Sequence, residues 1–209
     1  MKRNFISTAP ESIRMFKNDF LESLSKVHFL VPLIIYISVI IFLSMEALLD
    51  PQTNGWIFFG WFMLGIFMWT LTEYVFHRFI FHYEPTSSFG QRVHFIVHGV
   101  HHDYPNDFRR LVMPPSASVP MACAFFFLFK LILPPGAVFA FFPGFIGGYL
   151  SYDLAHYALH HARFKSPFLL KLKQRHIMHH YSNAATGYGV SLAFWDKIFN
   201  SDFPDKKHE

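Results

Sequence analysis

Histidine is concentrated in four short stretches of this 209-residue chain. The stretches are HRFIFH at 77–82, HFIVHGVHH at 94–102, HYALHH at 156–161 and HIMHH at 176–180. Only two of the 14 histidines, His28 and His208, lie outside them. Neutral imidazole is the commonest nitrogen ligand for iron, zinc and copper. One tetrahedral zinc ion needs about four ligands, so ten or more candidates predict two metal ions with high coordination numbers.

The spacing of these histidines predicts which of them bind metal. Residues three or four apart share a face of an α-helix, as do His156 and His160 and the triplets in the second and fourth stretches. His77 and His82 are five apart, so they do not share a face of an ideal helix, and we expect His82 to reach round from the helix end. The predicted ligands are His77, His82, His98, His101, His102, His156, His160, His176, His179 and His180.

Four further residues are predicted to support the ligands. Metal-bound histidines usually donate their other ring N–H to a carboxylate or carbonyl. Asp153, three residues before His156, and Asp103, directly after His102, are expected to accept such bonds. His94 lies one turn before His98, while His161 points about 140° away from His156 on a regular helix. His161 is therefore expected not to bind metal. The same geometry does not exclude His94, but this residue lies one turn further from the cluster and is expected beside the metal site.

The elements that carry these motifs are those of an all-α membrane protein. Hydrophobic residues make up 52% of the chain and charged residues only 15%, against about 25% charged in soluble domains. A membrane-spanning helix needs about 20 apolar residues. The sequence predicts about four transmembrane helices in one domain over 1–209, at 27–49, 56–82, 116–133 and 137–157. The last two form either two tilted spans or a re-entrant hairpin.

The distribution of lysine and arginine predicts the orientation. Residues 1–26, 77–116 and 158–209 hold all the basic residues except Lys130, and the turn at 50–55 holds none. Cytoplasmic loops carry an excess of Lys and Arg, so both termini and all four histidine stretches are expected in the cytoplasm. The single Cys123 excludes an internal disulfide framework. Nothing in the modest charge of +4 indicates nucleic-acid binding.

These motifs resemble the fatty acid hydroxylase superfamily of integral-membrane di-metal enzymes, and most closely its fatty acid 2-hydroxylase branch. The stretches that carry the resemblance lie within about 70–200, and they are EYVFHRFIFH, HFIVHGVHHDYPNDFRRLVMPP, YDLAHYALHH and GYGVSLAFWDKIF. The resemblance implies a four-span membrane base with a cytoplasmic helical cap, in which ten of the twelve motif histidines bind two iron ions. It also implies O₂-dependent hydroxylation of the acyl carbon next to the carboxyl or amide carbonyl of a membrane lipid, ceramide-like or another N-acyl lipid.

The resemblance also implies an external source of electrons. Members from eukaryotes often carry a fused haem-binding electron-carrier domain, for which 209 residues leave no room. A separate electron-transfer protein is therefore expected, and the small size suggests a bacterial inner-membrane protein.

Two other functions are compatible with the same residues. A desaturase or sterol-type oxidase uses the same metals and differs only in its product. A structural zinc protein or a metal transporter belongs to another class, but a transporter holds its ligands near the bilayer midplane. Zinc readily occupies histidine sites, so zinc in a purified sample would not separate these functions.

Overall fold

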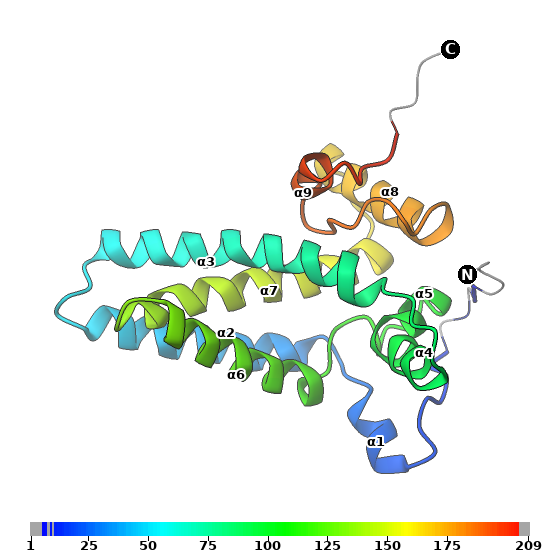
Figure 1. The fold of residues 1–209 in the computed structure, drawn as a ribbon, viewed down its shortest axis with the longest axis horizontal. Coiled ribbons are helices and arrows are strands. Elements are labelled where there is room, and N and C mark those ends of the chain that lie inside the picture. Colours follow the sequence, from blue (N-terminus) through cyan, green and yellow to red (C-terminus); the bar gives the residue numbers. More distant parts are fainter. Residues whose placement is uncertain (1–5, 8, 10, 205–209) are drawn as a thin grey trace.

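The computed structural model describes residues 6–7, 9 and 11–204, and among these every regular element is helical (Figure 1). The predicted all-α class is therefore confirmed. Lys2 and Arg3, used to predict the orientation, and His208, assigned no metal role, lie outside the described residues.

Four long helices lie side by side and form the elongated half of the molecule (Figure 1). They are α2 (Leu30–Leu49), α3 (Gly55–Val75), α6 (Pro115–Ile132) and α7 (Ala137–His161), with α3 continued by the π-helix η1 (Phe76–Phe81). Three are long and apolar enough to cross a membrane: α2, α3 with η1, and α6. Whether α7 makes a fourth span stays a prediction.

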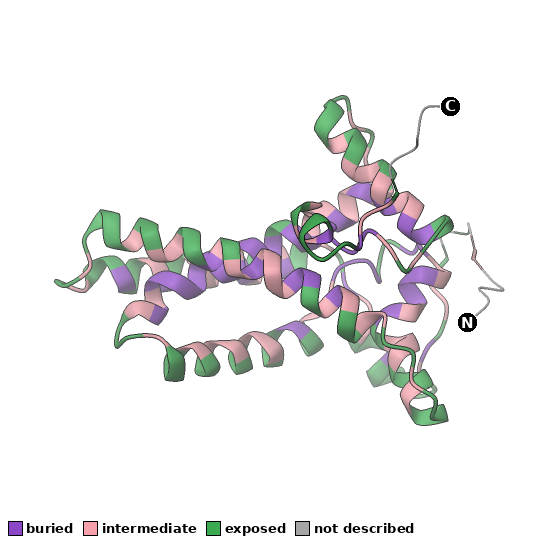
Figure 2. Ribbon diagram, turned by 45° about the horizontal axis from the view of Figure 1, so that its top comes forward, coloured by how far each residue is buried: buried purple, intermediate pink, exposed green. Residues whose placement is uncertain are grey.

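Helix α7 is the centre of this bundle. Of its 25 residues 15 are buried, mainly against α3 and α2. Helices α2, α3 and α6 instead carry many exposed large apolar residues, and Figure 2 colours much of the outer ribbon of the bundle as exposed or intermediate. This inverted pattern, with apolar groups on the outside, is expected where lipid replaces water as the solvent. Helices α6 and α7 are separate and antiparallel, joined by a turn in which Gly136 has a φ of 82°.

The short helices gather at one end of the bundle and form a cap (Figure 1). They are α1 (Asp19–Leu24), α4 (Ser88–His94), the π-helix η2 (Phe95–Gly99), α5 (Val100–Asp103), α8 (Pro167–Tyr181) and α9 (Phe194–Ile198). Every predicted metal ligand lies in this cap or at the ends of α3–η1 and α7 that adjoin it.

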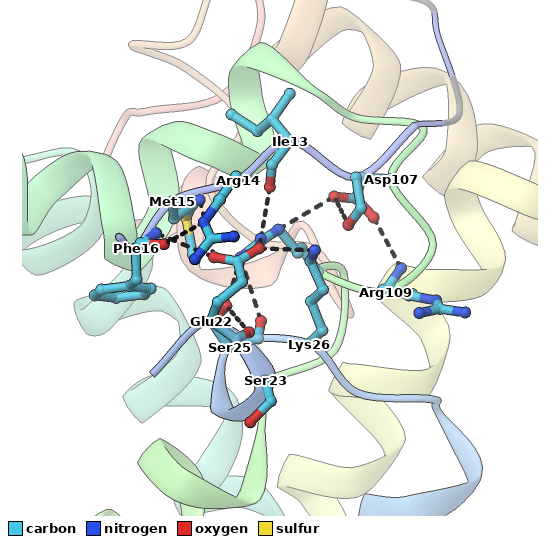
Figure 3. Close-up of polar contacts among 12 residues, drawn as sticks. Ile13, Arg14, Met15, Phe16, Glu22, Ser23, Ser25, Lys26, Asp107 and Arg109 are labelled. Atoms are coloured by element: carbon cyan, nitrogen blue, oxygen red, sulfur yellow. Dashed lines mark hydrogen bonds and ion pairs between the residues drawn. The ribbon is translucent and has the colours of Figure 1, made fainter. Parts of the chain in front are cut away.

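A buried ion network fastens the chain before α2 to the loop after α5 (Figure 3). The Glu22 carboxylate accepts hydrogen bonds from the backbone N–H groups of Met15 and Phe16, both at 3.0 Å. It also pairs with Lys26 and Arg110, each at 2.7 Å. Burial by itself raises the pKa of Glu22, but the Lys26 ammonium, the two N–H groups and Arg110 lower it from 4.5 to about 2. Glu22 is therefore charged at neutral pH and holds Arg110 in place.

Helices α3 and α7 approach so closely that glycine is required where they cross. A Cβ atom on Gly144 would lie 1.9 Å from the backbone oxygen of Phe62, and one on Gly65 would lie 2.1 Å from the backbone oxygen of Phe141. Small residues of this kind allow close packing of helices in membranes. The two helices that carry His77 and His156 are thereby held at a fixed separation.

We expect Gly144→Ala to force α3 and α7 apart, because the obstructing atom belongs to backbone that cannot rotate away. Overpacking of this kind costs roughly 1–3 kcal/mol, and it should lower the thermal unfolding temperature of the detergent-solubilised protein. The matched control is Gly60→Ala on α3, where a Cβ atom meets nothing within 4 Å. Equal unfolding temperatures for the two variants would show that this crossing does not limit stability.

Candidate metal centre

A π-helical turn brings the first two histidines onto one face. In η1 the backbone N–H of His82 donates to the carbonyl of His77 at 3.2 Å, a bond between residues five apart. The prediction that His77 and His82 do not share a face assumed an ideal α-helix and is wrong here, because a π turn is wider than an α turn. His82 does stand at the helix end, as expected.

The ten predicted ligands converge into two groups of five. Cluster 1 contains His77, His82, His98, His102 and His179. Cluster 2 contains His101, His156, His160, His176 and His180. Within each group the nitrogens available to a metal lie within 4.8 Å of one another. The two clusters adjoin, since the rings of His102 and His180 stack with their centroids 4.3 Å apart.

Two short helices supply ligands to both clusters. His101 and His102 on α5 are consecutive, yet they point into different clusters, and so do His179 and His180 on α8. Neighbouring residues project about 100° apart around an α-helix. A helix that lies between two metal positions can therefore supply one ligand to each position from two adjacent histidines. This explains the HH pairs at 101–102 and 179–180.

The separations of the ring nitrogens fit a bound metal ion. In cluster 1, His82 Nε2 lies 3.2 Å from His77 Nε2 and 2.9 Å from His179 Nε2. In cluster 2, His176 Nε2 lies 2.7 Å from His160 Nε2 and 3.0 Å from His180 Nε2. Ligand nitrogens about 2.1 Å from one ion lie about 3.0–3.4 Å from each other in octahedral or tetrahedral geometry. A shared cation satisfies these lone pairs together, so the donor set fits one metal ion in each cluster.

Burial keeps the cap imidazoles in the form that binds metals. The rings of His179 and His180 are fully buried, and six of the other eight are nearly so. Burial first, and the neighbouring imidazoles second, lower the pKa of His98, His101, His102, His176 and His180 well below 6.5. Neutral imidazole is the state that ligates a metal.

A loop of the C-terminal segment orients two ligands of cluster 1. His77 Nδ1 donates to the backbone oxygen of Tyr188 at 2.5 Å, and His179 Nδ1 donates to that of Thr186 at 2.8 Å. Each bond fixes the ring so that Nε2 faces the metal position. In cluster 2, by contrast, Nδ1 of His101, His176 and His180 has no hydrogen-bond partner among the described residues.

The residues predicted to support the ligands have separate outcomes. His161 is exposed and, like His94, lies in neither cluster. Asp153 does not accept the expected bond from an imidazole; it accepts bonds from the backbone N–H of Met113 at 3.1 Å and the Tyr149 hydroxyl at 3.4 Å. It ties α7 to the segment before α6. For Asp103 the structure gives a backbone contact to the N–H of Ser7 at 2.8 Å, and its role stays a prediction.

Sequence reasoning missed two buried carboxylates, Glu73 and Asp196. Both hold the backbone of the loop that orients His77 and His179. Glu73 carried a signal, because it is an acidic residue within a predicted membrane span, where ionisable groups are usually functional. Asp196 carried none, since its contacts with the loop are to backbone N–H groups, which no motif reveals.

An apolar cavity reaches toward both clusters from the bundle side. It is a narrow space of about 20 Å³ between α3, η1, α6 and α7. The lining residues are Trp69, Glu73, Phe76, Phe81, Met113, Met121, Phe125, Tyr149 and Tyr152. Phe81 stacks on His98 of cluster 1, and Tyr152 stacks on His156 of cluster 2. One aromatic ring therefore separates the cavity from each cluster.

Comparison with known proteins gives a consistent result. The model of the fatty acid hydroxylase family matches residues 62–201. The dihydroceramide fatty acyl 2-hydroxylase FAH2 of Arabidopsis thaliana is 36% identical over 91% of this chain and 80% of its own length. The human fatty acid 2-hydroxylase is 36% identical over 94% of this chain and 58% of its own length.

The yeast relatives are longer than this chain. The ceramide very long chain fatty acid hydroxylase SCS7 of Saccharomyces cerevisiae is 42% identical over 56% of this chain, a match that spans only 30% of the yeast protein. A solved structure described as full-length scs7p, with only the hydroxylase domain visible, superposes with a TM-score of 0.85 at 38% identity. That match covers 92% of this chain and 72% of the other.

The adjacent residues His160 and His161 test the ligand assignment. We expect His160→Ala to lower the metal content from about two ions per chain to about one, because it removes a nitrogen from cluster 2. His161→Ala should keep both ions, because its ring faces outward and packs near Tyr157. Metal analysis of the two purified variants at matched membrane insertion measures the difference. The same loss in both would contradict the assignment of His160.

Proposed function

This chain belongs to the fatty acid hydroxylase family, and we propose that it is a membrane di-iron monooxygenase that hydroxylates carbon 2 of a fatty acyl chain. The observation that carries the proposal is the pair of buried five-histidine clusters beside an apolar cavity. Support for carbon 2 comes from relatives named as fatty acid 2-hydroxylases and a dihydroceramide fatty acyl 2-hydroxylase.

The two clusters suit oxygen chemistry on an unactivated C–H bond. A bound iron pair supplies the two-electron reduction of O₂ and an oxidant able to remove a hydrogen atom. The balanced reaction consumes the C–H group, O₂, two electrons and two protons, and it yields C–OH and water. The electrons come from a separate electron-transfer protein in this proposal. The protein's own contribution is to hold ten neutral imidazoles and to exclude water around them.

The apolar cavity is the proposed site of the acyl chain. Its aromatic and methionine side chains offer no hydrogen bonds to an alkyl chain, and they line a path from the bundle to the rings of Phe81 and Tyr152. An amide or carboxyl head group then remains near the cap, with carbon 2 facing the clusters. A ceramide-like or other N-acyl lipid fits this arrangement and accords with the names of the relatives.

We place the clusters and both termini on the cytoplasmic side. The segments at the cap end of the bundle carry several basic residues, whereas the turn between α2 and α3 has none. These basic residues include Arg78, Arg92, Arg163, Lys165 and Lys171. Such an asymmetry is typical of cytoplasmic loops. The relatives described above are eukaryotic, and the bacterial inner membrane stays a prediction.

Lipid analysis tests the reaction. Cells that make the protein should contain acyl lipids with one added oxygen at carbon 2, labelled when labelled O₂ is supplied, and cells with the His101→Ala variant should not. A new double bond without added oxygen would reassign the protein as a desaturase. Bound metal without any lipid product in the presence of a reductant would favour the structural-zinc function.

Substitution of Met121 tests the cavity. Met121→Trp should fill part of the space, and it should reduce hydroxylation of long chains roughly tenfold or more relative to short ones, the scale of discrimination that pocket contacts produce. Phe127→Trp on the same helix is the matched control, because Phe127 is 62% exposed on the outer face. The measurement is the distribution of product chain lengths. An unchanged distribution in both variants would exclude this cavity as the acyl site.

A further inference from the structure

Two buried carboxylates have no part in the reaction as described above. Glu73 lies within α3, where only 4% of its surface is exposed, and Asp196 on α9 is fully buried. Acidic side chains are almost never fully buried unless they are paired. Asp196 pairs with Arg175 at 3.4 Å, but that arginine has a second carboxylate partner in Asp202. What the two carboxylates hold in common is the backbone of a single loop.

The loop from 186 to 191 presents four successive N–H groups to these carboxylates. Asp196 accepts from Tyr188 N at 2.9 Å through Oδ1 and from Gly189 N at 2.8 Å through Oδ2. Glu73 Oε1 accepts from Val190 N and Ser191 N, both at 2.9 Å, and its Oε2 accepts from the Ser191 hydroxyl at 2.6 Å. An α3 residue and an α9 residue thus fix four adjacent peptide groups.

One of these peptide groups links Asp196 directly to a histidine of cluster 1. The peptide between Tyr188 and Gly189 has its N–H bound to Asp196 and its oxygen bound to Nδ1 of His77. Hydrogen bonds joined through a shared group polarise one another. The carboxylate therefore acts on His77 through one peptide, in place of the direct carboxylate–histidine contact common at metal sites.

Gly189 is required for the contact between this loop and Asp196. A Cβ atom on Gly189 would lie 2.1 Å from the backbone oxygen of Leu192 and 3.0 Å from Oδ2 of Asp196. Only glycine allows the peptide to approach the carboxylate so closely.

We propose that Asp196 and Glu73 are positioning residues specific to cluster 1. They hold the loop so that the carbonyls of Tyr188 and Thr186 accept from Nδ1 of His77 and His179, which leaves Nε2 of each ring for the metal. Cluster 2 has no matching loop contact at Nδ1 of His101, His176 or His180 among the described residues. The two metal positions are therefore unequal, and loss of the loop contacts weakens cluster 1 alone. This inference rests on the metal binding in the proposed function.

The test compares Asp196→Asn with Glu73→Gln in the full chain, loaded with zinc and then exposed to a chelator. Asparagine places an NH₂ group against Tyr188 N or Gly189 N, because both oxygens of Asp196 accept backbone N–H groups. Zinc in one site should then be bound roughly 10- to 100-fold more weakly, and the other site should be unchanged. Glu73→Gln should behave nearly as the parent, because Gln Oε1 still accepts from both amides and its NH₂ can donate to the Ser191 hydroxyl. Glu73→Ala should resemble Asp196→Asn.

Two controls separate positioning from general stability. Asp107→Asn removes another buried carboxylate, one that bonds Ser12 and the backbone of Arg109 and touches no cluster, and it should retain both zinc ions. Combining Asp196→Asn with His160→Ala should remove the tight binding of both ions. Equal weakening of both sites in Asp196→Asn, or none in either, would overturn the inference. A parent protein that binds no metal would instead overturn the proposed function.

Discussion

The structure depends on one electrostatic constraint: ten imidazoles lie in two groups, eight of them are buried, and the available nitrogens of each group lie within 4.8 Å of one another. A buried polar nitrogen without a partner costs free energy, and a proton cannot satisfy five converging nitrogens. Burial lowers the pKa of the cap imidazoles, which keeps them neutral. One cation in each cluster, as proposed above, would satisfy these nitrogens together, and the surrounding helices hold them within 4.8 Å of one another.

The membrane bundle and the cap share that task. Helices α3 and α7 are locked together by glycine contacts at Gly65 and Gly144, and each ends in histidines. The π-helix at the end of α3 widens the turn, so that His77 and His82 face the same cluster. Helices α5 and α8 then lie between the clusters and contribute to both. The loop at 186–191 adds the hydrogen bonds that orient two rings of cluster 1.

The cavity lies between α3, η1, α6 and α7, on the bundle side of the clusters, and its lining is mainly apolar. In the proposed function this is the side from which an acyl chain reaches the metal positions. The Glu22–Arg110 network ties the segment before α2 to the loop after α5.

The sequence by itself predicted the all-α membrane class and the ten histidines that converge, because residue type and helical spacing are local properties. It also separated His160 from His161, since a regular helix projects them in different directions. Only the tertiary structure decided how the ten divide into two clusters, because the division depends on which side of α5 and α8 each metal position lies. The same is true of the shared face of His77 and His82, which a π turn creates, and of Asp153, whose carboxylate is taken by Met113 and Tyr149. Asp196 and Glu73 escaped prediction because they act on backbone N–H groups, which every residue has and no motif distinguishes.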